Sequence, residues 1–283
     1  MEELVKVETP SAGVSRLVMN RPERANAQTN KLLYALDDAL IELSRDSETR
    51  VIILAGEGKH FSSGHDLGPG EFDATLTGVE PVGVWGGFGQ PAMEGYMAFE
   101  EEAYFGLCWR WRNIPKPVIA AVQGKVIAAG LMLAWVCDII IASEEATFTD
   151  PVIAAGANGV EYFAHPWELG VRKAKEMLFT GQGITAQMAE KLGMVNRVVP
   201  RDQLDAETLQ LAKIIAEKPV MGLRLAKMAV NQTQDEQGFY NSLRSAMGLQ
   251  HLSHAHNWAL HGKPADPAAS DLIRRTLKLG PLK

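Results

Sequence analysis

The stretch from Pro117 to Ser143 constrains the fold more than any other part of the chain. Val118 to Val122 is a short, apolar run with strand composition, and Asp138 to Ile141 resumes that composition after the apolar segment Val126 to Val136. Gly124 separates the first run from this segment. The sequence therefore predicts a strand, a turn, a buried helix and a second strand.

Three small residues, Ala128, Ala129 and Gly130, lie at the expected entrance of the buried helix. Small side chains allow a ligand to approach the unpaired backbone N–H groups of a helix start, where the helix dipole also favours negative charge. The same residues could serve only to let the helix pack tightly. Both interpretations are open from this stretch alone.

The N-terminal part of the chain alternates strand and helix signals. Leu4 to Glu8 and Val14 to Met19 alternate across a Pro-Ser-Ala-Gly turn, which predicts a hairpin. A helix with Thr29 or Asn30 as its N-cap follows, and Arg50 to Ala55 is a further apolar strand. This alternation favours an α/β core with crossover connections.

At 283 residues the chain exceeds a typical single domain, which predicts one layered core over residues 1–200 and a helical C-terminal region over residues 201–283. Pro219 and Pro264 break this second region, and the expected helices are 204–216, 219–232, 235–261 and 267–277.

The segment from Gly68 to Gly106 carries Gly, Pro and scattered large apolar residues without a regular period. Structureless stretches of this length inside a domain often serve as lids. We therefore expect residues 68–106 to form a lid insertion over an apolar acyl pocket, the alternative being a passive insertion.

Charge and cysteine content narrow the class of partner. A net charge of -6 without a basic face gives no footprint for nucleic acid or an anionic membrane, so we expect a small-molecule partner. Cys108 and Cys137 lie in apolar surroundings and predict buried free thiols, which fits a cytoplasmic location. The first residues show no secretion signal, and no apolar run approaches the length of a membrane span.

Two loops resemble each other in their position after a strand: Ser62 to Asp66 and Ile127 to Gly130. If both open onto one cleft, the backbone N–H groups of His65 and Ala129 could bind one oxygen, as an oxyanion hole binds an enolate. Backbone donors place no demand on the side chains there.

These segments together resemble the crotonase superfamily, the enoyl-CoA hydratase/isomerase family. RPERANA at 21–27 is similar to its N-terminal signature, and HFSSGHDL at 60–67 is similar to its first oxyanion segment. PVIAAVQGKVIAAGLMLAWVCDIIIAS at 117–143 resembles the second oxyanion strand and helix. EKPVMGLRLAK at 217–227 resembles the start of a late helix, so the collinear likeness spans roughly residues 3–232.

The resemblance implies an α/β crotonase-like spiral of ββα units whose C-terminal helices serve trimerisation, in a homotrimer or a dimer of trimers. It implies an acyl-CoA substrate, coenzyme A being part of the substrate thioester, with no permanently bound cofactor and no metal. The thioester oxygen would lie between the N–H groups of His65 and Ala129, with Gly130 as the neighbouring alternative. The implied coenzyme A contacts are Glu23, Arg24, Ala25, Ala27, Phe61, Ser63, Gly64 and His65.

The chain departs from the family at two positions. Hydratases of the family carry two glutamates that hold and activate water, and Met132 and Val152 stand at those positions here. Neither side chain can hold a proton, so two-carboxylate hydration gives way to isomerisation or C–C hydrolysis as the expected reaction.

Glu161 is the first candidate for a replacement proton carrier, because burial in an uncharged loop would raise the pKa of its carboxyl. It could equally be an acid that complements a helix start. Asp150 is the second candidate, although an aspartate before a proline is typical of a turn. His165 favours a structural role, and the side chain of His65 could contact phosphate or substrate.

Two further groups of residues receive a structural interpretation. His251, His254, His256 and His261 lack metal-ligand spacing and predict a solvated or subunit-facing surface. The aromatic helix around Trp109 and Trp111 predicts packing rather than stacking on nucleic acid.

The leading hypothesis is an acyl-CoA enzyme that stabilises a thioester enolate with backbone amides. The alternative is a catalytically silent acyl-CoA-binding protein, which the loss of both glutamates motivates. A third hypothesis, a hydrolase of oxidised ring substrates without coenzyme A, would need polar replacements in the oxyanion loops, whose small, N–H-donating segments are retained here.

Overall fold

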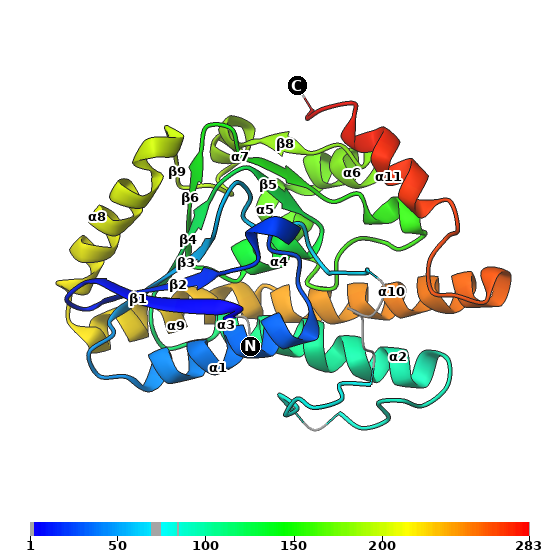
Figure 1. The fold of residues 1–283 in the computed structure, drawn as a ribbon, viewed down its shortest axis with the longest axis horizontal. Coiled ribbons are helices and arrows are strands. Elements are labelled where there is room, and N and C mark those ends of the chain that lie inside the picture. The colour runs from blue at the N-terminus through cyan, green and yellow to red at the C-terminus, as the bar shows by residue number, and fades with distance from the viewer. Residues whose placement is uncertain (1–2, 69–74, 84, 283) are drawn as a thin grey trace.

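The computed structural model describes residues 3–68, 75–83 and 85–282, and shows an α/β protein with two sheets (Figure 1). Part of the predicted lid insertion, residues 69–74 and 84, lies outside the described residues. The six strands of the main sheet follow the order β1-β2-β3-β4-β6-β9, with β1 and β2 antiparallel and the other pairs parallel. Their bounds are β1 Val5–Ser11, β2 Val14–Met19, β3 Val51–Gly56, β4 Val118–Val122, β6 Ile139–Ser143 and β9 Arg197–Val199.

The main sheet is buried on both faces because alternate residues of its parallel strands point to two separate clusters. Ile52 and Leu54 of β3 join a large core with α1 (Asn30–Arg45). Ile53 of β3 and its neighbours on the other face pack against α8 (Leu204–Ala216). Figure 1 shows α1 and α8 on opposite sides of the strands. The expected α/β core with crossover connections is confirmed.

The segment that constrains the fold contains one element more than expected. After β4 the chain forms a short strand, β5 (Lys125–Ile127), before α4 (Ala129–Trp135) and β6. β5 pairs with β7 (Thr147–Thr149), which pairs in turn with β8 (Ile184–Thr185) in a second, three-stranded sheet. The predicted helix over 126–136 therefore begins only at Ala129, because Val126 is taken into this sheet.

Part of the predicted lid is helical rather than structureless. One continuous helix consists of α2 (Met93–Phe99), a π-helix over Glu100–Gly106 and α3 (Leu107–Arg112). We call residues 93–112 the roof helix. All six residues from Glu100 to Phe105 are buried, so tertiary packing, and not an amphipathic 3.6-residue period, stabilises this segment.

The remaining helices follow one another along the chain. They are α5 His165–Leu169, α6 Val171–Thr180, α7 Ala186–Leu192, α9 Val220–Glu236, α10 Phe239–His261 and α11 Ala269–Leu277. The C-terminal region after residue 203 is helical, but its first helix, α8, packs against one face of the main sheet. The long α10 contacts α2, and Figure 1 shows it running beside the roof helix.

Candidate active site

The structure brings the two predicted oxyanion loops into direct contact. Ser62 and Val126 form a parallel bridge, and the amide of Ile127 donates to the carbonyl of Ser62 at 3.0 Å. Gly64 has φ of +87°, and a Cβ there would lie 2.7 Å from the carbonyl oxygen of Ile127. Only glycine therefore allows this approach without strain. The start of α4 and the loop after β3 thus meet at Gly64.

The amides of His65 and Ala129 lie at this junction. The residues on either side of His65 form backbone hydrogen bonds with Gln28. The amide of Gln28 donates to the carbonyl of Gly64 at 2.8 Å, and the amide of Asp66 donates to the carbonyl of Gln28 at 2.9 Å. No hydrogen bond of the His65 amide is recorded within residues 3–68, 75–83 and 85–282. Ala129 is the first residue of α4, where a backbone N–H has no partner within the helix. The two amides are therefore available to a ligand oxygen.

The residues beside Ala129 show why the helix entrance carries small side chains. Ala128 has φ of 49°, a left-handed conformation that costs energy for a residue with a Cβ and is frequent at functional sites. A Cβ on Gly130 would clash with the carbonyl of Ser62. Gly130 is thus needed for close packing, whereas the strained turn at Ala128 orients the amide of Ala129.

The loop over residues 22–28 lies against the loop over residues 61–66, as the predicted coenzyme A contacts require. The amide of Ser63 donates to the carbonyl of Ala25 at 3.0 Å. Phe61, Gly64 and Ala27 are buried, whereas the side chains of Glu23 and Arg24 are exposed. The structure thus brings these residues together, with charged side chains on the solvent side.

An ion pair that the sequence analysis did not identify holds these two loops. Nη1 of Arg21 lies 3.1 Å from Oδ2 of Asp66, and Nη2 of Arg24 lies 3.1 Å from Oδ1 of the same carboxylate. Burial alone would raise the pKa of Asp66, but the hydrogen bonds from Arg24, the Gly68 amide and Arg21 outweigh it and lower this pKa. Arg21 and Asp66 both lie within the motifs that carried the resemblance.

Glu161 lies beside the oxyanion loops. Its Oε2 is 3.4 Å from Nε2 of His65, and both side chains are largely buried. The His65 imidazole stacks on the ring of Tyr104, with centroids 3.7 Å apart and an interplanar angle of 14°. The first proton-carrier candidate therefore lies next to His65, one of the two predicted oxyanion residues.

The roof helix presents a stripe of residues to Glu161. Tyr96, Glu100, Tyr104 and Cys108 follow one another at intervals of four along this continuous helix, which places them near one face. Burial, and then the negative charge of Glu161, raise the pKa of both Tyr104 and Cys108. The carboxyl of Glu161 thus faces this stripe from across the site.

The two positions at which the resemblance implies glutamates, Met132 and Val152, are apolar in three dimensions as well. Met132 lies in α4 and is 2% exposed, and Val152 packs against the core at the start of a single 3₁₀ turn, Val152–Ala155. Neither offers a hydrogen bond to a water molecule.

Both carboxylate oxygens of Asp150, the second proton-carrier candidate, bind groups of the surrounding loop. Its two oxygens accept from the amides of Val152 and Val160 at 3.0 Å each, and Oδ2 lies 2.8 Å from Nε2 of His165. Both side chains are wholly buried. Asp150 and His165 therefore close the loop that carries Glu161 into place.

The histidines of α10 differ from the expectation of a solvated or subunit-facing surface. His256 and His261 are exposed, but His254 is buried and His251 is half-buried, because both imidazoles face the buried carboxylate of Glu100. Their partner lies about 150 residues earlier in the chain, so local spacing could not reveal it. In the described part of the chain, no cluster of three potential ligands has the geometry of a metal site.

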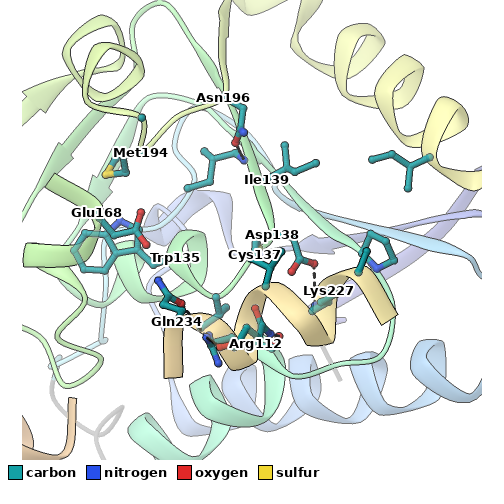
Figure 2. Close-up of a pocket in the computed structure, with 18 of the residues that line it drawn as sticks. Arg112, Trp135, Cys137, Asp138, Ile139, Glu168, Met194, Asn196, Lys227 and Gln234 are labelled. Carbon is teal, nitrogen blue, oxygen red and sulfur yellow. Dashed lines mark hydrogen bonds and ion pairs between the residues drawn. The ribbon is translucent and has the colours of Figure 1, made fainter. Parts of the chain in front are cut away.

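A cavity beside α9 is separate from the oxyanion loops (Figure 2). It has a volume of about 480 Å³ and lies between the end of α4, α9 and α5. Asp138 and Lys227 form an ion pair at its wall, with Oδ2 and Nζ 2.8 Å apart, and Glu168 lines its opposite side. Burial raises the pKa of Glu168 to about 8.

None of the helices in the described ranges has the length and the apolarity that crossing a bilayer takes.

Comparison with known proteins places these features in context. A family profile described as Enoyl-CoA hydratase/isomerase matches residues 9–73 and 87–257. A Mycobacterium tuberculosis protein, provisionally named enoyl-CoA hydratase EchA13, is 42% identical over 259 residues, covering 90% of this chain and 81% of that protein.

Solved structures share the fold. A crystal structure of a provisionally assigned enoyl-CoA hydratase from Mycobacterium smegmatis is 45% identical, with a TM-score of 0.83, and covers 93% of this chain and 99% of that one. A structure described as a monofunctional enoyl-CoA isomerase from M. smegmatis is 29% identical, with a TM-score of 0.64, over 82% of this chain and 94% of that one. The expected crotonase-like α/β fold is confirmed.

Proposed function

Because the chain belongs to the enoyl-CoA hydratase/isomerase family, we propose that it binds an acyl-CoA thioester and stabilises its enolate between the amides of His65 and Ala129. The observation that carries this proposal is the junction at Gly64, where both amides lie without a recorded partner in the described ranges. Two donors that converge on one oxygen favour the enolate over the thioester, because negative charge develops on that oxygen.

We further propose that Glu161 carries the proton. Its carboxyl lies beside His65, whose amide is one of the two donors, so a substrate α-carbon held there comes within its reach. The imidazole of His65, fixed by Tyr104, orients this carboxylate through the 3.4 Å contact.

The reaction that these groups support best is double-bond isomerisation. A single carboxylate can break a C–H bond at the α-carbon of a 3-enoyl thioester, hold the proton while the dienolate forms, and return the proton to the γ-carbon. No water is consumed and atoms balance. Hydration instead requires a bound water, and Met132 and Val152 offer it no partner. The likeness to a protein described as an enoyl-CoA isomerase supports this choice.

The helical region supports the proposed homotrimer. No residue of α9 joins the core within the single chain, although the side chain of Lys227 is largely covered. The exposed apolar residues of α9 are Val220, Met221, Leu225, Met228 and Val230. Light scattering coupled to gel filtration tests the assembly directly, and a monomer at micromolar concentration contradicts it.

The test of the function compares a 3-enoyl-CoA with crotonyl-CoA. We expect the wild-type protein to form the conjugated 2-enoyl thioester, and Glu161→Gln to lower kcat by about 100-fold or more. Ala129→Pro removes one donor and should lower kcat by about 100-fold, whereas Ala129→Gly keeps the amide and should stay within about threefold. Circular dichroism verifies that each variant is folded.

Other outcomes select the alternatives. Rapid hydration of crotonyl-CoA that depends on Glu161, with no isomerisation, shows a hydratase with a relocated acid. Tight binding of acyl-CoA with no product from either thioester shows the catalytically silent binder. If neither thioester binds, the proposed function is wrong.

A further inference from the structure

The roof helix is fastened to α10 through one buried carboxylate. Glu100 is 1% exposed, and its two oxygens face two different imidazoles. Oε1 lies 3.2 Å from Nε2 of His254, and Oε2 lies 3.2 Å from Nε2 of His251. A carboxylate buried to this degree needs such partners, because an unpaired buried charge costs several kcal/mol.

The surroundings of His254 favour its charged form. Its Nδ1 lies 2.8 Å from the carbonyl oxygen of Pro264, and its Nε2 faces Glu100, so both ring nitrogens face acceptors. Only an imidazolium has two N–H donors for them. Burial would lower the pKa of His254, but the hydrogen bond and charge of Glu100, with the Pro264 carbonyl, outweigh it and raise this pKa.

Further contacts between the two helices surround this pair. Glu101 forms an ion pair with Arg244 of α10, and the guanidinium of Arg244 lies 5.2 Å from the ring centroid of Phe105. Tyr96 of α2 packs edge-on against His254, with ring centroids 4.9 Å apart. These side chains make α10 the support of the roof helix.

The position of the roof helix determines what lies above the reacting atoms. One turn beyond Glu100, Tyr104 stacks on His65, and both Tyr104 and His254 experience the charge of Glu161. We propose that Glu100, gripped between His251 and His254, is a positioning latch that holds the roof helix, and with it Tyr104, over the acyl-CoA site. The catalytic meaning of the latch rests on the proposed function, but the latch itself does not.

The latch has a defined pH window. The pKa of His254 is raised from 6.5. The stabilisation that the charged imidazole gives to the latch is therefore complete below pH 6.5 and is lost as the pH rises through the raised pKa. Burial would raise the pKa of Glu100, but the hydrogen bonds and charges of His251 and His254 lower it from 4.5. Its contribution is therefore present above pH 4.5 and is lost as the pH falls through the lowered value. The latch is strongest between these limits.

Other titratable groups face this pair from the surrounding elements. They are Tyr96 of α2, the Glu101–Arg244 pair, the second imidazole His251 and Glu161 of the opposite loop. Burial and the charges of Glu100 and Glu161 raise the pKa of Tyr96 far above the window, so Tyr96 stays neutral within it.

The chain contains a built-in reporter of roof-helix opening. Cys108 lies on the same stripe as Glu100 and is 2% exposed, so its thiol reacts only when the helix moves. Cys137 follows α4 and lines the cavity of Figure 2 together with Arg112, so it reports opening at the C-terminal end of the roof helix, away from Glu100. A short pulse with a soluble alkylating reagent, followed by mass spectrometry of the two peptides, measures both rates in one sample.

We expect Glu100→Gln and His254→Gln each to raise the Cys108 labelling rate about tenfold or more at pH 6, with Cys137 unchanged. The double variant should exceed neither single variant by more than about twofold, because both remove one interaction. His256→Gln, an exposed histidine of the same helix, should label as wild type. The ratio of variant to wild-type rate should approach one above the raised pKa of His254, where the wild-type latch is itself released.

Two results overturn the latch: Cys108 rates that match wild type in both variants, or an equal rise at Cys137, which shows general destabilisation. A ratio that does not change between pH 6 and pH 9 also overturns it. None of these measurements needs turnover, so a failure of the proposed function leaves them readable. If the function holds, the latch variants should raise KM for acyl-CoA more than they lower kcat, since the proton carrier is intact.

Discussion

The imidazole of His65 lies on the phenol ring of Tyr104 with ring centroids 3.7 Å apart and planes 14° from parallel. This stack joins the roof helix to the loop that provides one of the proposed oxyanion donors. It also aims Nε2 of His65 at Glu161, since an imidazole held on one face has little rotational freedom. The geometry of Glu161, the proposed proton carrier, is therefore expected to depend on Tyr104, which reaches it only through His65.

Replacing Tyr104 tests that dependence. Tyr104→Phe keeps the ring and should leave the rate within about twofold, whereas Tyr104→Leu should lower kcat about five- to tenfold, because an aromatic stack contributes about 1 kcal/mol. The measurement is the turnover of a 3-enoyl-CoA at saturation. Equal rates in the two variants would show that the stack does not position His65.

Asp150 and His165 provide a prediction on stability. Asp150→Ala leaves His165 and the amides of Val152 and Val160 without their acceptor, so we expect a loss of about 3–5 kcal/mol in the free energy of unfolding. Denaturant titration at pH 7 measures it. Asp202→Ala, at an exposed position outside the site, serves as a control and should change stability by less than about 0.5 kcal/mol. A loss of less than about 1 kcal/mol in the free energy of unfolding for Asp150→Ala would contradict the structural role and make Asp150 a candidate proton carrier again.

The strands of the main sheet and the first helix could be predicted because their signals are local, whereas the meeting of the two loops was only a condition of the oxyanion hypothesis. Thr29 caps α1 through a hydrogen bond from the amide of Leu32 at 3.2 Å, as its position before an apolar period indicated. The apolar runs of β3 and β4 pair in parallel, as crossover connections require. In each case residues close in sequence contain the information.

Most of the roof helix and the latch could not be predicted, because their signals are not local; only the end around Trp109 and Trp111 carries a helix signal. The segment from Tyr96 to Cys108 contains three consecutive glutamates, which fits neither an amphipathic helix nor a strand. Each glutamate is buried beside a partner elsewhere in the chain: Glu100 meets His251 and His254, Glu101 meets Arg244, and Glu102 accepts from the amide of Gly83. A single sequence does not contain those pairings in any window.

The ion pair between Asp138 and Lys227 should contribute strongly to stability. The side chain of Lys227 is only 7% exposed, and burial raises the pKa of Asp138 although Lys227 opposes it. Lys227→Met leaves this carboxylate without its cation, so we expect a loss of about 2–3 kcal/mol. In an Asp138→Asn background the same change should cost about 1 kcal/mol or less.

The matched control is Lys173→Met, which removes an exposed pair with Glu176 on the surface of α6. It should change the free energy of unfolding by less than about 0.5 kcal/mol, because exposed pairs contribute little. Thermal or urea unfolding of the four proteins at pH 7 provides the cycle. Additive losses for Lys227→Met and Asp138→Asn would mean that the two side chains do not depend on each other.

Glu168 should make stability fall with rising pH. Burial raises the pKa of its carboxyl to about 8 from 4.5, and the described residues offer it no hydrogen bond or ion pair. The folded state therefore holds the proton of Glu168 more tightly than the unfolded state does. The contribution of the protonated carboxyl to the free energy of unfolding is complete below pH 4.5 and is lost as the pH rises through about 8. Ionisation in the cavity is the cause of the loss.

Glu168→Gln cannot ionise and should remove that loss. We expect wild type and variant to unfold at similar temperatures at pH 5, and the variant to gain on the order of 1–3 kcal/mol at pH 9, a range reduced because the carboxyl keeps some contact with solvent through the cavity. Glu236→Gln, an exposed glutamate at the end of α9, should show no such difference between the two pH values. A constant offset of Glu168→Gln at both pH values would assign its effect to packing, because only a carboxyl that titrates between them makes the difference depend on pH.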